Sequence, residues 1–220
     1  MDIVIIEGLK KYFEEDSGQV KALDGIDLTV EKGRITAIIG ASGMGKTTLF
    51  NIIGGLYRPT DGKITVDGVN LADLTEDQLT VYRRRKVGFI FQDYRLIPEL
   101  TIGENILLPL WLDDSRPDKE FFKELTSAVG LAHELEKYPA MLSDGGRQCV
   151  AIARALITKP SIVLADEPTG NLDAKSARNI AGLLKMTVER FRQTLILITH
   201  NLELAQLADR VVRLRDGRVV

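Results

Sequence analysis

Short apolar runs along the chain alternate with longer stretches in which apolar residues recur three or four positions apart. The short runs predict β-strands at residues 3–6, 34–39, 63–66, 87–91, 161–165 and 194–198. The longer stretches predict helices at residues 46–56, 75–85, 117–129, 145–158 and 174–191. Strands that alternate with helices in this way predict a wound α/β fold.

Several of these elements carry more specific signals. The runs at 34–39, 161–165 and 194–198 are almost continuously apolar, which is typical of parallel strands covered on both faces. The helix expected at 75–85 opens with Thr75-Glu76-Asp77-Gln78, a capping box. The last apolar residues flank Asp216-Gly217, a dipeptide that favours a tight β-hairpin turn.

Residues 93–158 differ from the rest of the chain because they hold helical patterns and no convincing strand. We therefore predict that 93–158 form a helical subdomain, with the apolar residues around Trp111 in its core. The remaining residues, 1–92 and 159–220, are predicted to form the α/β core, so that one domain accounts for residues 1–220.

Composition narrows the class of protein. The 220 residues include 45% hydrophobic and 27% charged side chains, which excludes a disordered or fibrous chain. A net charge of -2 argues against nucleic acid as a partner, and the single cysteine, Cys149, fits a reducing compartment. No apolar stretch is long enough to span a bilayer, and no signal peptide is visible at the start. We therefore expect a soluble, cytoplasmic chain.

A glycine-rich sequence follows the predicted strand at 34–39 and opens the next predicted helix. Residues 40–47 read Gly-Ala-Ser-Gly-Met-Gly-Lys-Thr, which fits the phosphate-loop pattern G-x-x-x-x-G-K-[ST] in its required context. Glycines let backbone N–H groups turn toward phosphate oxygens, and the helix N-terminus adds a positive dipole. Lys46 is expected to reach the β- and γ-phosphates, and the Thr47 hydroxyl is expected to bind Mg²⁺. This motif alone leaves kinases, GTPases, RecA-like motors and transport ATPases open.

The candidate phosphate-binding residues extend one position beyond the motif. They are Gly40, Ala41, Ser42, Gly43, Met44, Gly45, Lys46, Thr47 and Thr48.

Polar residues at the ends of three predicted strands complete a candidate catalytic site. Asp166 and Glu167 follow the strand at 161–165, and behind a phosphate loop such a pair predicts Mg²⁺ binding by Asp166 and general-base action by Glu167. Gln92 and His200 follow strands too, and they are candidates for contacts with Mg²⁺ or the γ-phosphate. Taken alone, each of these residues also has a structural interpretation. The acidic pair fits an ordinary strand-end turn, Gln92 fits a surface residue, and His200 fits a hydrogen-bonded loop residue.

The order of these motifs resembles that of the ATP-binding subunits of ABC transporters. Between Gln92 and His200 lie a signature-like segment, Leu142-Ser143-Asp144-Gly145-Gly146, and the sequence Asn171-Leu172-Asp173. Tyr12 stands where the family places an aromatic residue that stacks on adenine. Some stretches, such as Asp166-Glu-Pro-Thr-Gly-Asn-Leu-Asp173, look like the bacterial branch of lipoprotein-release, macrolide-export and antimicrobial-peptide-resistance ATPases. The resemblance covers essentially the whole chain.

The resemblance implies a fold and a mechanism. The fold would be a P-loop NTPase (RecA-like) core with a small antiparallel β-subdomain and an inserted helical subdomain. Two subunits would pair head to tail, each ATP lying between one phosphate loop and the partner's Ser143 and Gly145. Glu167 would activate water, and the closed site would be organised by Gln92, Asp173 and His200.

The resemblance also implies partners. Mg²⁺ would be held by Thr47, Gln92 and Asp166, and the other cofactor would be ATP. A membrane-spanning permease would dock near Gln92–Glu99, which would place the chain on the inner face of the cell membrane.

The signature departs from the family's usual L-S-G-G-Q or L-S-G-G-E. Asp144 replaces a glycine, Gly146 replaces the last residue, and Cys149 stands where arginine is common. At 4 Å from a nucleotide charge, one carboxylate costs about 1 kcal/mol in water and about 4 kcal/mol at an effective dielectric of about 20. We therefore hypothesise that ATP turnover through this signature is slow, whereas ATP binding to the phosphate loop survives.

Three other functions stay open at this point. The ATPase can drive a mechanical signal in a membrane complex instead of transport, or the chain can be an ATP-binding module with little catalysis. The third possibility is a soluble P-loop protein such as a kinase. A kinase, however, would lack Gln92, the signature and His200 in this order.

Overall fold

The computed structural model describes residues 1–15 and 18–220 and divides into two compact units. Unit 1 joins Met1–Arg83 to Thr194–Val220, and unit 2 comprises Arg84–Gln193. These units are not the subdomains expected from the sequence, which assigned 93–158 alone to the helical part. That assignment stays a prediction, and each unit is described by itself.

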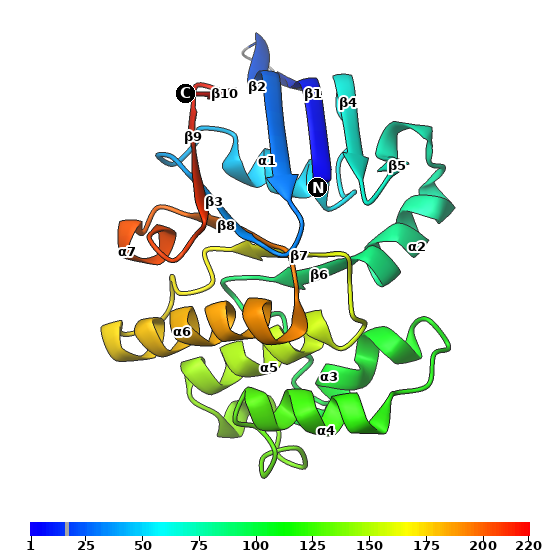
Figure 1. Cartoon of the computed structure of the whole chain (residues 1–220), viewed down its shortest axis with the longest axis vertical. Helices are drawn as coiled ribbons and strands as arrows, with labels where there is room; N and C mark the ends of the chain where they lie inside the picture. The colour runs from blue at the N-terminus through cyan, green and yellow to red at the C-terminus, as the bar shows by residue number, and fades with distance from the viewer. Residues whose placement is uncertain (16–17) are drawn as a thin grey trace. The chain divides into compact units, whose positions relative to one another are not determined.

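Unit 1 contains an antiparallel sheet near the start of the chain. Its strands lie in the order β2 (Gly18–Glu31), β1 (Asp2–Glu15), β4 (Asp61–Val66) and β5 (Val69–Asn70) (Figure 1). The strand predicted at 3–6 is thus much longer, and β2 was not predicted at all. Residues 18–21, the first four of the 14 residues of β2, are exposed and lack apolar alternation, whereas Ile26, Leu28 and Val30 near its end are buried and alternate with more exposed residues.

Unit 1 also contains the parallel strands that precede the candidate site. β3 (Ile35–Ile39) pairs in parallel with β8 (Leu195–Thr199) on one side and β9 (Arg210–Arg215) on the other. Every residue of β3 and β8 is buried, as the continuous apolar runs predicted. The expected hairpin is present, because β10 (Arg218–Val219) pairs antiparallel with β9.

Helices flank these strands. α1 (Lys46–Ile53) follows β3, and the four-residue α7 (Leu202–Ala205) packs on β3 and β8. A 3₁₀ turn (Leu71–Asp73) precedes α2 (Glu76–Lys86). The predicted capping box is confirmed, since the Thr75 backbone N–H donates to Gln78 Oε1 at 2.8 Å and the Gln78 N–H donates to Thr75 Oγ1 at 3.3 Å.

Unit 2 combines two parallel strands with four helices. β6 (Val87–Ile90) pairs in parallel with β7 (Ile162–Asp166). The helices, together with one 3₁₀ turn, are α3 (Ile102–Trp111), α4 (Lys119–Ala128), the turn at Pro139–Met141, α5 (Asp144–Leu156) and α6 (Ala174–Phe191).

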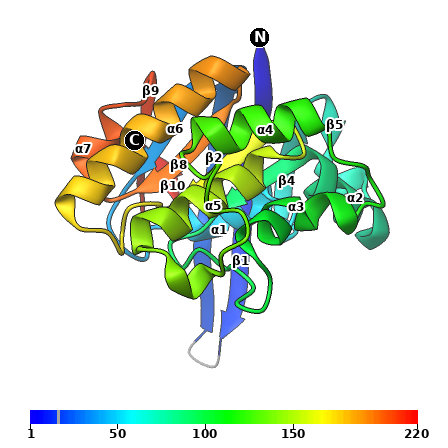
Figure 2. The ribbon, with the colours of Figure 1, turned by 90° about the horizontal axis from the view of Figure 1, so that it is seen from below.

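α5 is the central helix of unit 2. It contacts α3, α4 and α6 as well as β6 (Figures 1 and 2). Its approach to β6 is close, because a Cβ at Gly88 would lie 2.2 Å from the Ala155 carbonyl oxygen. The signature therefore begins a helix that is fixed on several sides.

Two expectations for unit 2 need correction. α3 was not predicted, because its apolar run is short and contains Pro109. The core role expected around Trp111 is wrong, since Trp111 is 43% exposed and Leu112 is 60% exposed. Residues 93–158 contain no strand, as predicted. Within the described parts of the chain, no helix is both long and apolar enough to cross a membrane.

Candidate functional site

The phosphate loop, residues 40–47, connects β3 to α1 and depends on its glycines. Gly43 and Gly45 have φ angles of 80° and 90°, in the left-handed region that favours glycine. A Cβ at Gly45 would lie 2.3 Å from the Ala22 carbonyl oxygen, and one at Gly40 would lie 2.4 Å from that of Leu214. Neighbouring backbone therefore leaves no room for a side chain at either end of the loop.

Lys46 lies inside this loop. It is the first residue of α1, its side chain is almost fully buried, and its Nζ donates to the carbonyl oxygens of Gly40 and Ala41, each at 2.8 Å. Its positive charge is thus held next to the N-terminus of α1, where the helix dipole adds to it. This is an arrangement suited to a phosphate group.

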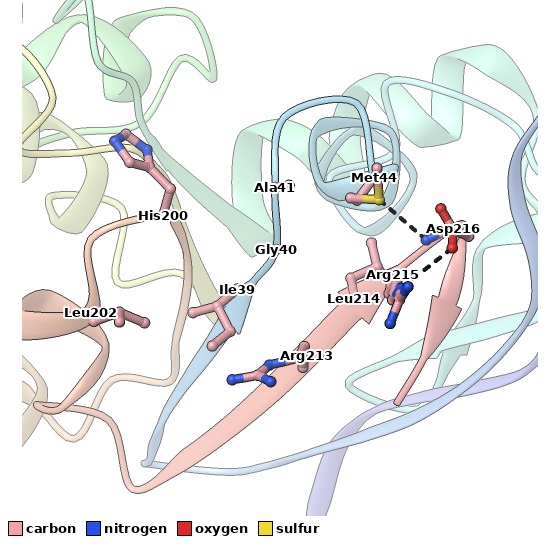
Figure 3. A pocket seen from close by; sticks show the side chains of 10 residues that line it. All are labelled: Ile39, Gly40, Ala41, Met44, His200, Leu202, Arg213, Leu214, Arg215 and Asp216. Carbon is pink, nitrogen blue, oxygen red and sulfur yellow. Dashed lines mark hydrogen bonds and ion pairs between the residues drawn. The ribbon is translucent and has the colours of Figure 1, made fainter.

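A pocket of about 580 Å³ lies beside the loop. In the view of Figure 3, Gly40 and Ala41 lie between His200 and Met44, and β9 contributes Arg213 to the lining. The structure therefore brings His200, which follows β8, to the phosphate loop within unit 1. Its contact with a γ-phosphate stays a prediction.

Tyr12, the candidate adenine-stacking residue, is held by side chains that the sequence did not single out. Its hydroxyl donates to Asp24 Oδ1 at 2.5 Å, and Arg218 donates to Asp24 Oδ2 at 2.9 Å. The Tyr12 and Arg218 hydrogen bonds lower the pKa of Asp24 to about 2. No local motif could have found this set, because Asp24 and Arg218 are 194 residues apart in the chain.

Gln92 in unit 2 contacts the segment that follows the acidic pair. Its Nε2 donates to Asn171 Oδ1 at 2.9 Å, and Asn171 Nδ2 donates back to the Gln92 carbonyl oxygen at 3.0 Å. Gly170 lies so close that a Cβ there would be 2.7 Å from Gln92 Nε2. The Gln92 side chain is thus oriented by residues 170–171, and its binding of Mg²⁺ stays a prediction.

The acidic pair stands at the end of β7, as predicted. Asp166 is the last residue of the strand, and Glu167 has a φ of 45°, which is uncommon for a residue other than glycine. The Glu167 carbonyl oxygen accepts a hydrogen bond from the Gly170 N–H at 2.9 Å. A tight turn therefore fixes the backbone from which the predicted general base projects.

Asp173 caps α6. Its Oδ1 accepts from the N–H groups of Lys175 and Ser176 at 2.9 and 3.1 Å, and its Oδ2 accepts from Ser176 Oγ at 2.6 Å. The Ser176 hydrogen bonds hold the pKa of the Asp173 carboxyl below its usual value. The structure thus assigns Asp173 a capping role, and its role toward nucleotide stays a prediction.

The signature, Leu142–Gly146, forms the N-terminus of α5. Ser143 is the N-cap, as predicted, and its Oγ accepts a hydrogen bond from the Gly146 N–H at 3.2 Å. Asp144 is exposed and forms an ion pair with Arg147, with Oδ1 and Nη1 3.1 Å apart. Gly145 packs against Ser176, with 3.6 Å between the position of a Cβ and the serine Cβ. Arg147 was missed, although its spacing of three residues from Asp144 was a local signal.

α5 also fixes the segment that follows Gln92. Arg154 Nη2 donates to the Tyr94 carbonyl oxygen at 2.6 Å, and Nη1 donates to that of Arg95. Tyr94 and Arg95 both have positive φ angles, 60° and 47°, so this arginine stabilises an uncommon backbone conformation. Cys149 on the same helix is a largely buried thiol whose pKa burial raises to about 11, which makes it unreactive.

The predicted site residues fall into two groups, one in each unit. Tyr12, the phosphate loop with Thr48, and His200 are in unit 1, and all the others are in unit 2. A hydroxyl, an amide and a carboxylate, from Thr47, Gln92 and Asp166, are the oxygen donors that suit Mg²⁺. In the part of the chain that the structure describes, no group of three or more His, Cys, Asp or Glu side chains could hold a metal by itself.

Comparison with known proteins gives consistent matches. The family described as "ABC transporter" matches residues 23–170. The lipoprotein-releasing system ATP-binding protein LolD 1 of Rhodopseudomonas palustris is 40% identical over 99% of this chain and 98% of its own length. The bacitracin export ATP-binding protein BceA of Halalkalibacterium halodurans is 38% identical over 100% of this chain and 87% of its own. The macrolide export ATP-binding/permease protein MacB of Rhodopirellula baltica is 40% identical over 99% of this chain, which spans only 32% of that longer protein.

Solved structures agree. A dimeric post-hydrolysis state of the ATP-binding cassette MJ0796 bound to ADP and Pi has a TM-score of 0.87 at 37% identity, covering 98% of this chain and 96% of that one. The cbiO1 subunit of the cbiONQ transporter complex of Clostridium perfringens has a TM-score of 0.88 at 28% identity, covering 100% and 87%. The predicted P-loop α/β fold with an antiparallel β-subdomain is therefore confirmed.

Proposed function

This chain belongs to the ABC transporter family, as an ATP-binding ATPase domain, and from that premise we propose that it powers a membrane transporter by closing in pairs around two ATP molecules. The observation that carries the proposal is Lys46, buried inside a loop in which a Cβ at Gly40 or Gly45 would clash with neighbouring backbone. A buried ammonium at a helix N-terminus is a site for a polyphosphate.

The chemical step is the hydrolysis of the bound ATP. Lys46 and the backbone N–H groups of residues 40–48 hold the phosphates, and Glu167 accepts a proton from the attacking water. Thr47, Gln92 and Asp166 would hold Mg²⁺, which when bound neutralises charge on the phosphate oxygens. His200 and Asp173 organise the closed site around the γ-phosphate.

The pairing follows from the location of the signature. Ser143 and Gly145 stand at the N-terminus of α5, which is itself an anion-binding element. In the proposed pair, this helix end faces the ATP held by the partner's phosphate loop. The dimeric state of the MJ0796 cassette supports this arrangement. Each site is then incomplete without a second ATP-binding subunit. Within each copy, we propose that residues 93–158 move as a helical subdomain against a core formed by residues 1–92 and 159–220.

A membrane-spanning permease subunit is the proposed output partner. We place its docking site at Gln92–Glu99, because Arg154 holds the backbone of this segment and Gln92 is connected to Asn171. Movement of the docked segment is thereby transmitted to the residues that follow Glu167. The chain would act on the inner face of the cell membrane, held there by the permease.

A second candidate function is favoured by one observation, the carboxylate of Asp144 in the first turn of α5. In that case the chain binds ATP and hydrolyses it slowly. The Arg147 ion pair weighs against a large effect, because it offsets the negative charge within the same helix.

The test separates binding from hydrolysis. MgATP binding is measured by calorimetry and phosphate release by a continuous assay, for the full chain with its permease. We expect Lys46→Ala to abolish binding, and Glu167→Gln to bind ATP while losing about 100-fold or more in turnover, the usual contribution of a general base. Unchanged affinity in Lys46→Ala would reject the site, and unchanged turnover in Glu167→Gln would reject the assigned base.

A further inference from the structure

Tyr12 is anchored in unit 1 through both its backbone and its side chain. Its N–H donates to Thr60 Oγ1 at 3.0 Å, and its hydroxyl donates to Asp24 Oδ1 at 2.5 Å. The Lys21 ammonium lies 5.3 Å from the centroid of the Tyr12 ring. An aromatic ring at the surface is thus given one orientation by groups on β2.

Asp24 is in turn bound by the C-terminal hairpin. Its Oδ2 accepts from Arg218 Nη2 at 2.9 Å, and its backbone N–H donates to the Gly217 carbonyl oxygen at 2.9 Å. Gly217 comes close to β2, because a Cβ there would lie 2.9 Å from the Ala22 carbonyl oxygen. The hairpin therefore joins β2 through one side-chain pair and one backbone hydrogen bond at the same position.

The same hairpin contacts the phosphate loop. The Asp216 N–H donates to the Met44 sulfur at 3.3 Å (Figure 3). The Ala22 carbonyl oxygen, which limits the space at Gly217, also limits it at Gly45, where a Cβ would be 2.3 Å away. Residues 22–24 thus contact the loop and the hairpin together.

Both oxygens of the Asp24 carboxylate are engaged, one by the phenol and one by the guanidinium. The Asp24 side chain is only 21% exposed, whereas Arg218 is 65% exposed. An exposed ion pair contributes little to folding. The Arg218 hydrogen bond does, however, hold the Asp24 carboxylate, and the hydrogen bond from the Tyr12 hydroxyl to that carboxylate restricts the rotation of the tyrosine side chain, which is what a stacking platform requires.

We propose that Asp24 and Arg218 are positioning residues that orient the Tyr12 ring for the adenine of ATP, and that the C-terminal hairpin thereby ties the adenine site to the phosphate loop. This inference rests on the proposed function, since it deepens the assignment of Tyr12. It predicts that Arg218 affects the binding of the nucleotide base and does not affect the binding of the phosphates.

The test compares two ligands on the full chain by calorimetry, MgATP and magnesium tripolyphosphate, which has phosphates but no base. We expect Arg218→Met to weaken ATP binding about three- to tenfold, the effect of one ordinary hydrogen bond, and to leave tripolyphosphate binding unchanged. Arg218→Lys restores part of the ATP affinity. Tyr12→Phe, which keeps the ring and removes the hydroxyl, weakens ATP binding similarly, and the double variant is no weaker than either single one.

A matched control is available in the same unit. Arg34 forms an ion pair with Asp209 at 3.1 Å and is similarly exposed, at 55%. Arg34→Met should leave the affinity for both ligands unchanged. An equal loss of ATP and tripolyphosphate affinity in Arg218→Met would overturn the inference, as would an unchanged ATP affinity. Failure of the wild-type chain to bind either ligand would instead reject the proposed function.

Discussion

The phosphate loop and the signature both stand at the N-terminus of a helix, a position that suits a phosphate group, but they are built differently. In the loop, neighbouring backbone surrounds Gly40 and Gly45, and the cation Lys46 is buried. In the signature, the polar groups are exposed side chains, with Ser143 as the cap and Asp144 paired to Arg147. Backbone packing therefore dictates the sequence of the loop, whereas the first turn of α5 leaves room for substitution.

The largest effect is expected from Gly45→Ala. Its φ of 90° costs an L-residue about 1–2 kcal/mol, and its Cβ would lie 2.3 Å from the Ala22 carbonyl oxygen. We expect the free energy of unfolding, measured in urea, to fall by about 2–4 kcal/mol. Because the start of α1 must shift, we also expect ATP affinity, measured by calorimetry, to fall at least about 100-fold.

Gly43→Ala is the matched control for this prediction. Gly43 has a similar φ of 80°, but no atom lies within 4 Å of the position of its Cβ. Only the cost of the backbone conformation then applies, so the free energy of unfolding should fall by about 1–2 kcal/mol. Equal losses at the two glycines would show that conformation, and not close packing, makes the loop intolerant.

Local features of the two regions could be predicted from sequence, and long-range ones could not. The start of α1 at Lys46 and the cap at Ser143 follow from short motifs, and both are observed. β2 was missed although Ile26, Leu28 and Val30 alternate with polar residues near its end; its exposed first residues, 18–21, give no such signal. The contact of Asp24 with Arg218 joins distant residues, which no periodicity encodes.

The next effect in size concerns the charge of Asp144. We expect Asp144→Gly to raise ATP turnover about fivefold, the lower end of the cost of a carboxylate near a nucleotide, because Arg147 already offsets part of its charge. Turnover is measured as phosphate release by the assembled complex, at low and at high salt. The gain should shrink at high salt, since exposed charges are screened. Equal rates for the two proteins at low salt would refute the hypothesis of a weakened signature.

Arg147→Met supplies the control for that experiment. With Asp144 present, removal of its partner should slow turnover further, and in the Asp144→Gly background the same change should have little effect. This double-mutant cycle isolates the contribution of the ion pair between Asp144 and Arg147, whose two charged atoms lie 3.1 Å apart. Equal effects of Arg147→Met in both backgrounds would mean that Arg147 acts independently of Asp144.

The smallest effect is expected from Gly146→Gln, which restores the residue common at the end of the signature. Inside a helix, glutamine is favoured over glycine by up to about 1 kcal/mol. The new Cβ would lie 3.2 Å from the Leu142 Cβ, so part of this gain is lost to a close side-chain contact. The free energy of unfolding in urea should therefore change by less than about 1 kcal/mol. The affinity of a single copy for ATP should not change, because in the proposed arrangement that ATP lies in the copy's own phosphate loop. A loss of about 2 kcal/mol or more would show that the first turn of α5 is packed as closely as the phosphate loop, and the contrast between the two helix ends would then not hold.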